Sequence, residues 1–169
     1  MDTVYRKTKM GVRNEPDGFG LVEVIIGAAA LALLIVVVMN ALSSSLVLSQ
    51  NSLRRTQAAY LLEEGVEAVR VMRDSSWNSS LGSLTASTTY YFMFFNNTWQ
   101  ATSTNIMVDN LFERKFVLSN VYRDSNKDIA PAGTLDNNTK LVTVSVAWRD
   151  ERGTTTQTMA AYLTNLFGN

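Results

Sequence analysis

The 169-residue chain contains no cysteine, no histidine and only two prolines. Without cysteine no disulfide framework supports the fold, so its stability must come from packing. Without histidine or cysteine, acid–base and nucleophilic catalysis would fall to other side chains, and no spacing of such residues suggests either. Fifteen basic residues balance fifteen acidic ones, and no basic face appears for nucleic acid. We therefore expect neither an enzyme nor a nucleic-acid-binding protein, and no cofactor.

Charge is also scarce in one long stretch. Between Phe19 and Met39 the only ionisable side chain is Glu23. As a helix this stretch is about 30 Å long, which is enough to cross the apolar core of a bilayer. The residues in front of it hold more basic than acidic side chains, namely Arg6, Lys7, Lys9 and Arg13 against Asp2, Glu15 and Asp17. The positive-inside rule then predicts a single membrane crossing with a cytoplasmic N-terminus and an exported C-terminal part.

Glu23 is an unusual residue for a simple membrane anchor, because a carboxylate inside an apolar helix costs about 3 kcal/mol unless a partner neutralises it. Gly18 directly precedes Phe19, and Glu23 is the fifth residue counted from Phe19. In these residues the sequence resembles the type IV pilins and the type II secretion pseudopilins. The resemblance implies that a prepilin peptidase cuts after Gly18 and that Phe19 becomes a new, N-methylated N-terminus.

The residues of this motif also have a physical explanation. Glycine at position 18 offers a peptidase an unhindered backbone. Cleavage creates an amine that is largely protonated at neutral pH and needs a partner in lipid. Helical side chains lean toward the N-terminus, so Glu23 can reach the amine of its own Phe19 or the unpaired first-turn N–H groups. The resemblance implies a further partner, the amine of a neighbouring subunit, which would set the axial register of a filament.

Two positions depart from the commonest pilin pattern. Gly20 stands where Thr or Ser is more usual, and Asn40 stands where many pilins carry a helix-bending proline. Asn40 and the serines that follow at 43–45 compete for backbone hydrogen bonds, so we predict that an assembled helix is weakest there. The missing proline favours a minor over a major subunit, by resemblance alone.

The chain divides into four expected parts. Residues 1–18 form a leader, 19–44 a transmembrane or filament-core helix, 45–74 an amphipathic stem helix and 75–169 a β-rich head. Removal of the leader takes away four basic and three acidic residues and leaves a formal charge of −1. The stem has residues at helical spacing that are apolar or small except for one glutamine, which predicts one face packed on the head. These residues are Leu53, Gln57, Leu61, Leu62, Gly65, Val69 and Met72, joined by Ala58 and Ala68.

The head contains several strand patterns. Residues 90–95 are a dense run of β-formers. Residues 112–122 predict a second strand that is open to water on one side, because Phe116, Leu118 and Val121 are apolar and Arg114, Lys115 and Asn120 are polar. Residues 141–148 alternate, with Val142, Val144, Val146 and Trp148 on one face, and residues 154–163 return as the hairpin partner. The sequence therefore predicts an α+β fold, in which a long N-terminal helix packs on a small antiparallel sheet.

Two weaker candidate sites lie in the head. Asp124, Asn126 and Asp128 have the spacing of a calcium loop, but Ile129 replaces the required glycine and no Glu follows at the last ligand position. A surface turn is the preferred interpretation. The aromatic residues around 90–99 suggest either a sticky or carbohydrate-binding surface or, as the preferred interpretation, core packing.

Three functions are consistent with these features. The first is a minor pilin of a type IV pilus or related filament. Its partners would be prepilin peptidase, other pilin subunits, the inner-membrane assembly platform and, before assembly, the lipid bilayer. The second is a pseudopilin of a secretion or DNA-uptake machine. The third is a membrane-anchored exported binding module that never assembles. A conventional secretory signal cut after Ala41 is a further interpretation of the N-terminus, although the apolar run is long for one.

Overall fold

The computed structural model describes residues 18, 20–150 and 153–168. The chain forms two compact units, Met1–Val47 and Leu48–Asn169. One helix, α1, runs without interruption through Leu21–Ser75 and so contributes to both. The second unit contains every strand of the described chain.

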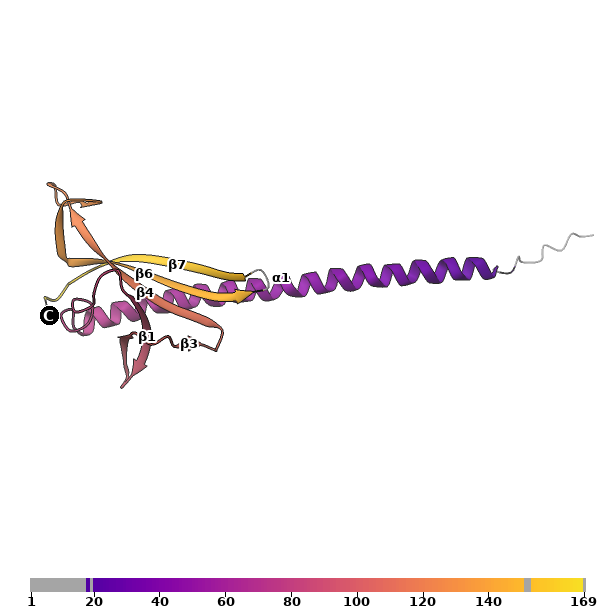
Figure 1. Cartoon of the computed structure of the whole chain (residues 1–169), viewed down its shortest axis with the longest axis horizontal. Helices are drawn as coiled ribbons and strands as arrows, with labels where there is room; N and C mark the ends of the chain where they lie inside the picture. Colours follow the sequence, from indigo (N-terminus) through magenta and orange to yellow (C-terminus); the bar gives the residue numbers. More distant parts are fainter. Residues whose placement is uncertain (1–17, 19, 151–152, 169) are drawn as a thin grey trace, which may run out of the picture. The chain divides into compact units, whose positions relative to one another are not determined.

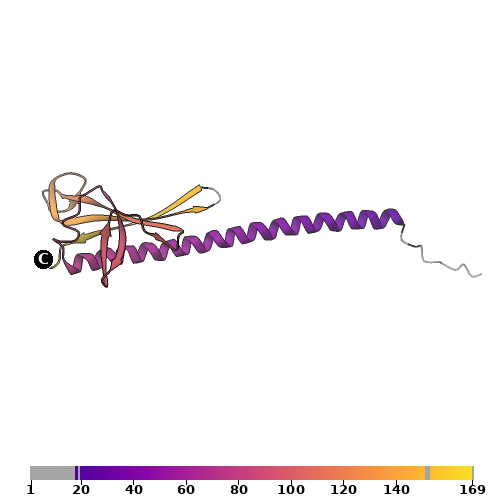
Figure 2. The same cartoon turned by 60° about the horizontal axis from the view of Figure 1, so that its bottom comes forward.

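The strands form a single antiparallel sheet, as Figures 1 and 2 show from two directions. Its principal order is β2-β1-β4-β6-β7, and the short strands β3 and β5 pair with β4. The strand bounds are Thr89–Phe95 for β1, Thr98–Thr102 for β2, Met107–Val108 for β3, Phe112–Arg123 for β4, Ile129–Ala130 for β5, Thr134–Asp150 for β6 and Gly153–Thr164 for β7. The predicted α+β class, a long N-terminal helix on an antiparallel sheet, is confirmed.

The core lies between one face of the sheet and the part of α1 within the second unit. The predicted stem face is largely confirmed, because Ala58, Leu62, Gly65, Ala68, Val69 and Met72 are all buried. Val66 is buried as well, although it lies outside the predicted stripe. Leu53 is 60% exposed and Gln57 is exposed as well, so the buried face begins only at Ala58, later than the spacing suggested.

Gly65 lies where the helix comes close to the sheet. A Cβ atom at this position would lie 2.8 Å from Cγ1 of Val144 and 3.4 Å from Cζ of Phe92. A contact as short as 2.8 Å is essentially never seen for a real Cβ atom, so α1 can come this close to Val144 because residue 65 has no side chain. The glycine therefore contributes to packing despite its poor helix propensity.

Strand β4 corrects the prediction for Arg114. The structure places this arginine on the inner face, 6% exposed, in alternation with the fully or almost fully buried Phe112 and Phe116. A β-bulge between Asn120 and Val121 then shifts the register of pairing with β6. The bulge explains why Val121 is also buried although it is out of phase with Phe116.

The hairpin of β6 and β7 agrees with the alternation in the sequence. Val142, Val144, Val146 and Trp148 are all buried, and the strands pair from Thr139↔Thr164 to Asp150↔Gly153. Strand β6 is longer than predicted, because it begins at Thr134. Its first residues pair with the end of β4 beyond the bulge.

Strand β2 is an element that the sequence prediction missed. It pairs with β1 through a two-residue turn at Asn96 and Asn97, whose φ angles are 50° and 60°. Two successive positive φ angles match the twist of a tight hairpin, and asparagine tolerates them. The hairpin divides the aromatic run: Phe92 is in the core, as preferred, but Phe94 and Phe95 are 58% and 55% exposed.

Candidate membrane and assembly segment

The N-terminus of α1 begins directly after Gly20. The carbonyl oxygen of Gly20 accepts hydrogen bonds from the backbone N–H of Glu23 at 2.9 Å and of Val24 at 3.3 Å. Gly18 is exposed, and apart from its chain neighbours no atom of the described residues lies within 4 Å of where its Cβ would be. The described part of the chain therefore does not cover Gly18. Phe19, the residue that follows the predicted cut, lies outside the described residues, and so do residues 1–17 of the expected leader.

Glu23 lies in the first helical turn and is exposed. A negative side chain is favourable there, because the unpaired N–H groups of the first turn carry partial positive charge. Among the described residues, no basic side chain forms an ion pair with Glu23. The carboxylate is therefore available for a cationic partner, and the predicted partner, an amine on Phe19, lies outside the described part.

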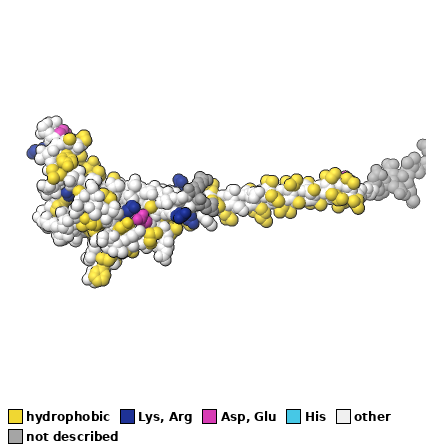
Figure 3. All heavy atoms as spheres, viewed as in Figure 1, with side chains coloured by type: hydrophobic (Ala, Val, Ile, Leu, Met, Phe, Trp, Pro, Cys, Tyr) yellow, Lys and Arg dark blue, Asp and Glu magenta, His cyan; other side chains and the backbone are white. Residues whose placement is uncertain are grey.

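Hydrophobic side chains surround the helix from Leu21 to Met39. Every residue of this stretch is exposed, and its most apolar 18-residue window has a mean hydropathy of 2.9. Figure 3 shows hydrophobic side chains along the visible face of this part of the helix. The helix is long and apolar enough to cross a membrane. So much exposed apolar surface in one chain requires a cover, either lipid or other protein.

The helix is unbroken at Asn40, in the isolated chain. The hydroxyls of Ser43 and Ser44 donate to the carbonyl oxygens of Met39 and Asn40, both at 2.9 Å. These bonds satisfy the hydroxyls within the helix itself, as a membrane setting requires. The predicted weak point concerns an assembled filament, so it stays a prediction.

The calcium-like loop is organised by Asp124. Its Oδ1 accepts hydrogen bonds from the backbone N–H of Asn126 at 2.8 Å and of Asp128 at 3.0 Å. Lys127 adopts a φ of 68°, and its carbonyl oxygen accepts a hydrogen bond from Nη1 of Arg123 at 2.7 Å. One carboxylate oxygen of Asp124 is thus used to close the turn, and a guanidinium lies beside it. In the described residues, no group of three or more acidic side chains gathers here or elsewhere as a metal site would require.

One ion pair of the second unit joins the helix to the sheet. Nη1 of Arg114 lies 2.6 Å from Oε2 of Glu64 on α1, and its guanidinium carbon lies 5.0 Å from the ring centroid of Phe92. The period of two in the strand places Arg114 in phase with Phe112 and Phe116 and Lys115 on the opposite face, so the alternation was the signal that could have located the buried arginine. The dense run of aromatics nearby was a second signal, because aromatic rings can shield a cation.

Comparison with known proteins leaves the family open: no protein-family model, no curated protein and no solved structure matches the chain.

Proposed function

We propose that the chain is a structural subunit of a type IV pilus or related filament, most similar to a minor pilin. The observation that carries the proposal is Glu23, an exposed carboxylate in the first turn of a helix whose next 16 residues are all apolar or glycine up to Met39. Cleavage after Gly18 would place a cation four residues before it. A charge pair between neighbouring subunits then explains why this acidic residue stands in the segment.

The surface of the first helical unit supports assembly. Its side chains are exposed on every side from Leu21 to Met39, and small residues at 27–30 allow helices to approach closely. In this proposal the same surface contacts lipid first and other subunits later. The N-terminus starts in the cytoplasm, and the second unit is exported, because basic residues dominate the segment before the helix.

The sheet unit supports a structural rather than a catalytic role. Several of its described ionisable side chains form ion pairs, such as Arg114–Glu64 and Arg123–Asp136, or close surface turns, as Asp124 does. In the proposal the second unit is the outward-facing part of the subunit. It is presented by the filament and takes no part in chemistry.

Intact mass and N-terminal sequencing of the protein from its native membrane test the proposal. A start at Phe19, with or without a methyl group, supports prepilin processing. A start at Met1 would favour a membrane-anchored module that does not assemble, and a start near Leu42 would identify a secretory signal.

Two glycine variants sharpen this test. Gly18→Leu should block cleavage, because a bulky side chain at the cut hinders the peptidase. Gly20→Ser is the matched control and should be processed normally, since the same helix start can be capped by serine. Normal shortening of Gly18→Leu would overturn the proposed cut site. Visible filaments would separate a pilus from a pseudopilus.

A further inference from the structure

A cavity of about 350 Å³ lies in the second unit, between the end of α1, the segment that follows it and strand β2. Its volume is in the range of small-molecule sites. Six polar or amphipathic residues supply its chemistry: Ser75, Ser79, Ser80, Thr98, Trp99 and Gln100. None of the described residues that line it is charged. A charged ligand would therefore find no counter-charge in the lining.

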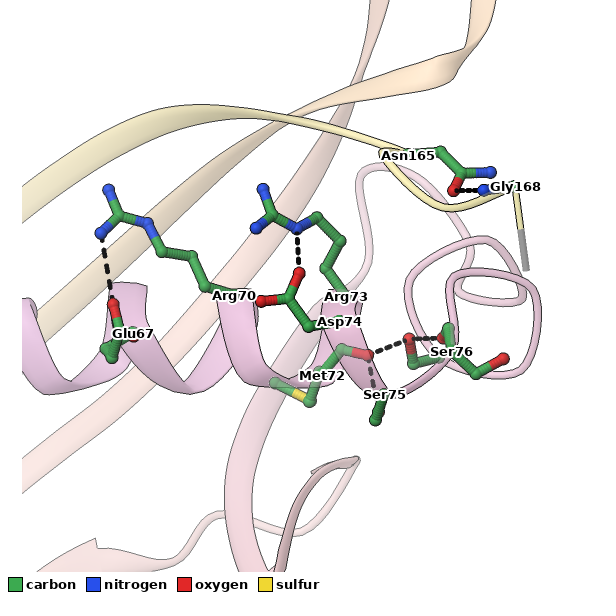
Figure 4. A network of polar contacts seen from close by, with 10 residues as sticks. Glu67, Arg70, Met72, Arg73, Asp74, Ser75, Ser76, Asn165 and Gly168 are labelled. Carbon is green, nitrogen blue, oxygen red and sulfur yellow. Dashed lines mark hydrogen bonds and ion pairs between the residues drawn. The ribbon is translucent and has the colours of Figure 1, made fainter.

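Backbone carbonyls orient the hydroxyl groups on the helix side of the cavity. Ser75 donates a hydrogen bond to the carbonyl oxygen of Met72 at 2.8 Å, which Figure 4 shows. The hydroxyl of Ser80 lies within hydrogen-bond distance of two carbonyl oxygens, that of Met72 at 2.8 Å and that of Ser76. A hydroxyl has one hydrogen and two lone pairs, so each serine keeps acceptor capacity after this bond is made. The helix side of the cavity therefore offers acceptors to a ligand that brings its own donors.

The strand side of the cavity supplies donors as well. Nε2 of Gln100 donates to Oγ1 of Thr98 at 3.3 Å and keeps a second N–H, and the amide oxygen of Gln100 stays an acceptor. The hydroxyl of Ser79 makes no side-chain hydrogen bond to another described residue. A purely apolar ligand would leave these groups without partners, which is costly once water is displaced.

Trp99 gives the cavity one large, fixed apolar side chain. Its indole contacts Phe94 at a centroid distance of 5.2 Å and Phe92 at 6.2 Å, both in tilted or T-shaped arrangements. The guanidinium carbon of Arg114 lies over the indole, 5.3 Å from its centroid. Three neighbours therefore restrict the ring, so a ligand that stacks on it loses little side-chain entropy to ordering.

We propose that this cavity binds a neutral saccharide. A sugar ring combines a patch of C–H groups, which suits the indole, with hydroxyls that both donate and accept, which suits the serines and Gln100. The absence of charge in the described lining selects against acidic and basic sugars. The inference does not depend on filament assembly, because every residue that carries it belongs to the second unit.

Tryptophan fluorescence of the full-length protein provides the test. Trp77 and Trp148 are only 3% exposed, so Trp99 is the indole that reports on the cavity. The protein is kept in an amine-oxide detergent, because sugar-headed detergents would compete. The probes are the methyl β-glycosides of glucose, galactose, mannose and N-acetylglucosamine. At least one should change the emission saturably.

Two matched glutamine variants test whether the glycoside binds in this cavity. Gln100→Ala should weaken binding about fivefold to tenfold, the usual effect of one lost hydrogen bond. Gln157 lies on β7 at the opposite edge of the sheet, so Gln157→Ala should leave the affinity for the glycoside unchanged. Trp99→Phe should also weaken binding. Because this variant lacks the fluorescent indole of residue 99, its binding is measured by saturation-transfer NMR on the glycoside.

Three results would overturn the proposal. The first is a lack of saturable binding for all four glycosides. The second is equal affinity of the Gln100→Ala and Gln157→Ala variants. The third is a response to an uncharged peptide, acetyl-Ser-Thr-Ser-Thr-amide, without any response to glycosides, which would identify the edge of β2 as a site for strand addition instead.

Discussion

Arg114 of β4 and Glu64 of α1 form an ion pair that joins the sheet to the helix, with 2.6 Å between Nη1 and Oε2. The two ends of the pair differ in exposure, because the side chain of Arg114 is 7% exposed and that of Glu64 is 49% exposed. Within the described residues, Nε of Arg114 has no hydrogen-bond partner. The buried cation therefore depends on Glu64 and on the aromatic rings of Phe92 and Trp99.

Glu64→Ala should destabilise the second unit by about 1–2 kcal/mol, because it leaves the buried guanidinium without its anion. The full cost of breaking a buried pair is not expected, since water reaches the exposed side of Glu64. Arg114→Met should cost less, because it removes the buried charge together with the pair. Chemical denaturation measures both variants. The control is Glu67→Gln in the exposed pair with Arg70, where a loss as large as that of Glu64→Ala would contradict the argument.

Gly65→Ala should lower the stability of the second unit by about 1 kcal/mol. The new methyl group meets Val144 at 2.8 Å, and overpacking of this kind costs more than the gain in helix propensity returns. Gly27→Ala is the matched control, because it is also a helical glycine and nothing lies within 4 Å of its Cβ position. Thermal melting followed by near-ultraviolet circular dichroism reports the comparison. Equal melting temperatures for the two variants would show that the helix adjusts without cost.

Because of Asp136, the free energy of unfolding of the second unit should decrease at acid pH. The hydrogen bond from Nε of Arg123 to Oδ2, 2.6 Å long, is the main cause that lowers the pKa of Asp136, and burial acts against it. Because the folded-state pKa lies below the unfolded value of about 3.9, the stabilisation is fully present above that value. It is lost as the pH falls through the folded pKa.

Two substitutions at this pair test the pH dependence. Asp136→Asn should be less stable than the parent protein at pH 7, and the difference should shrink as the pH falls below about 4. Arg123→Gln removes the donor and should reduce the same acid dependence. Urea denaturation at a series of pH values gives both curves. A constant difference between Asp136→Asn and the parent across the acid range would rule out the pair as its source.

Glu23→Ala should leave cleavage after Gly18 intact and reduce incorporation into filaments. The reason is that the proposed Glu23–amine pair forms only after processing and acts between subunits. Glu23→Asp is the control variant, since it keeps the charge on a shorter side chain and should retain more incorporation than alanine. Immunoblots of sheared filaments and of membranes measure the assembled and the unassembled subunit. Normal filament levels of Glu23→Ala would exclude an essential pair.

The membrane-length helix and the β6–β7 hairpin were predictable because each depends on local pattern. An apolar run with a single carboxylate at Glu23 sets its own helix and length, and the period of two from Val142 to Trp148 fixes one buried face. The strand β2 carried a weaker signal. Asn96 and Asn97 suit the two positive φ angles of its hairpin, but a pair of asparagines also occurs in ordinary loops.

The sequence by itself determined the long helix, the class of fold and the motif of Gly18, Phe19 and Glu23, because these follow from composition and short spacings along the chain. Tertiary structure decided what depends on distant neighbours. The buried position of Arg114 is tolerated because Glu64, fifty residues earlier, and two aromatic rings compensate the burial of its charge. The cavity beside Trp99 likewise exists only because the fold brings the end of α1 to an edge strand.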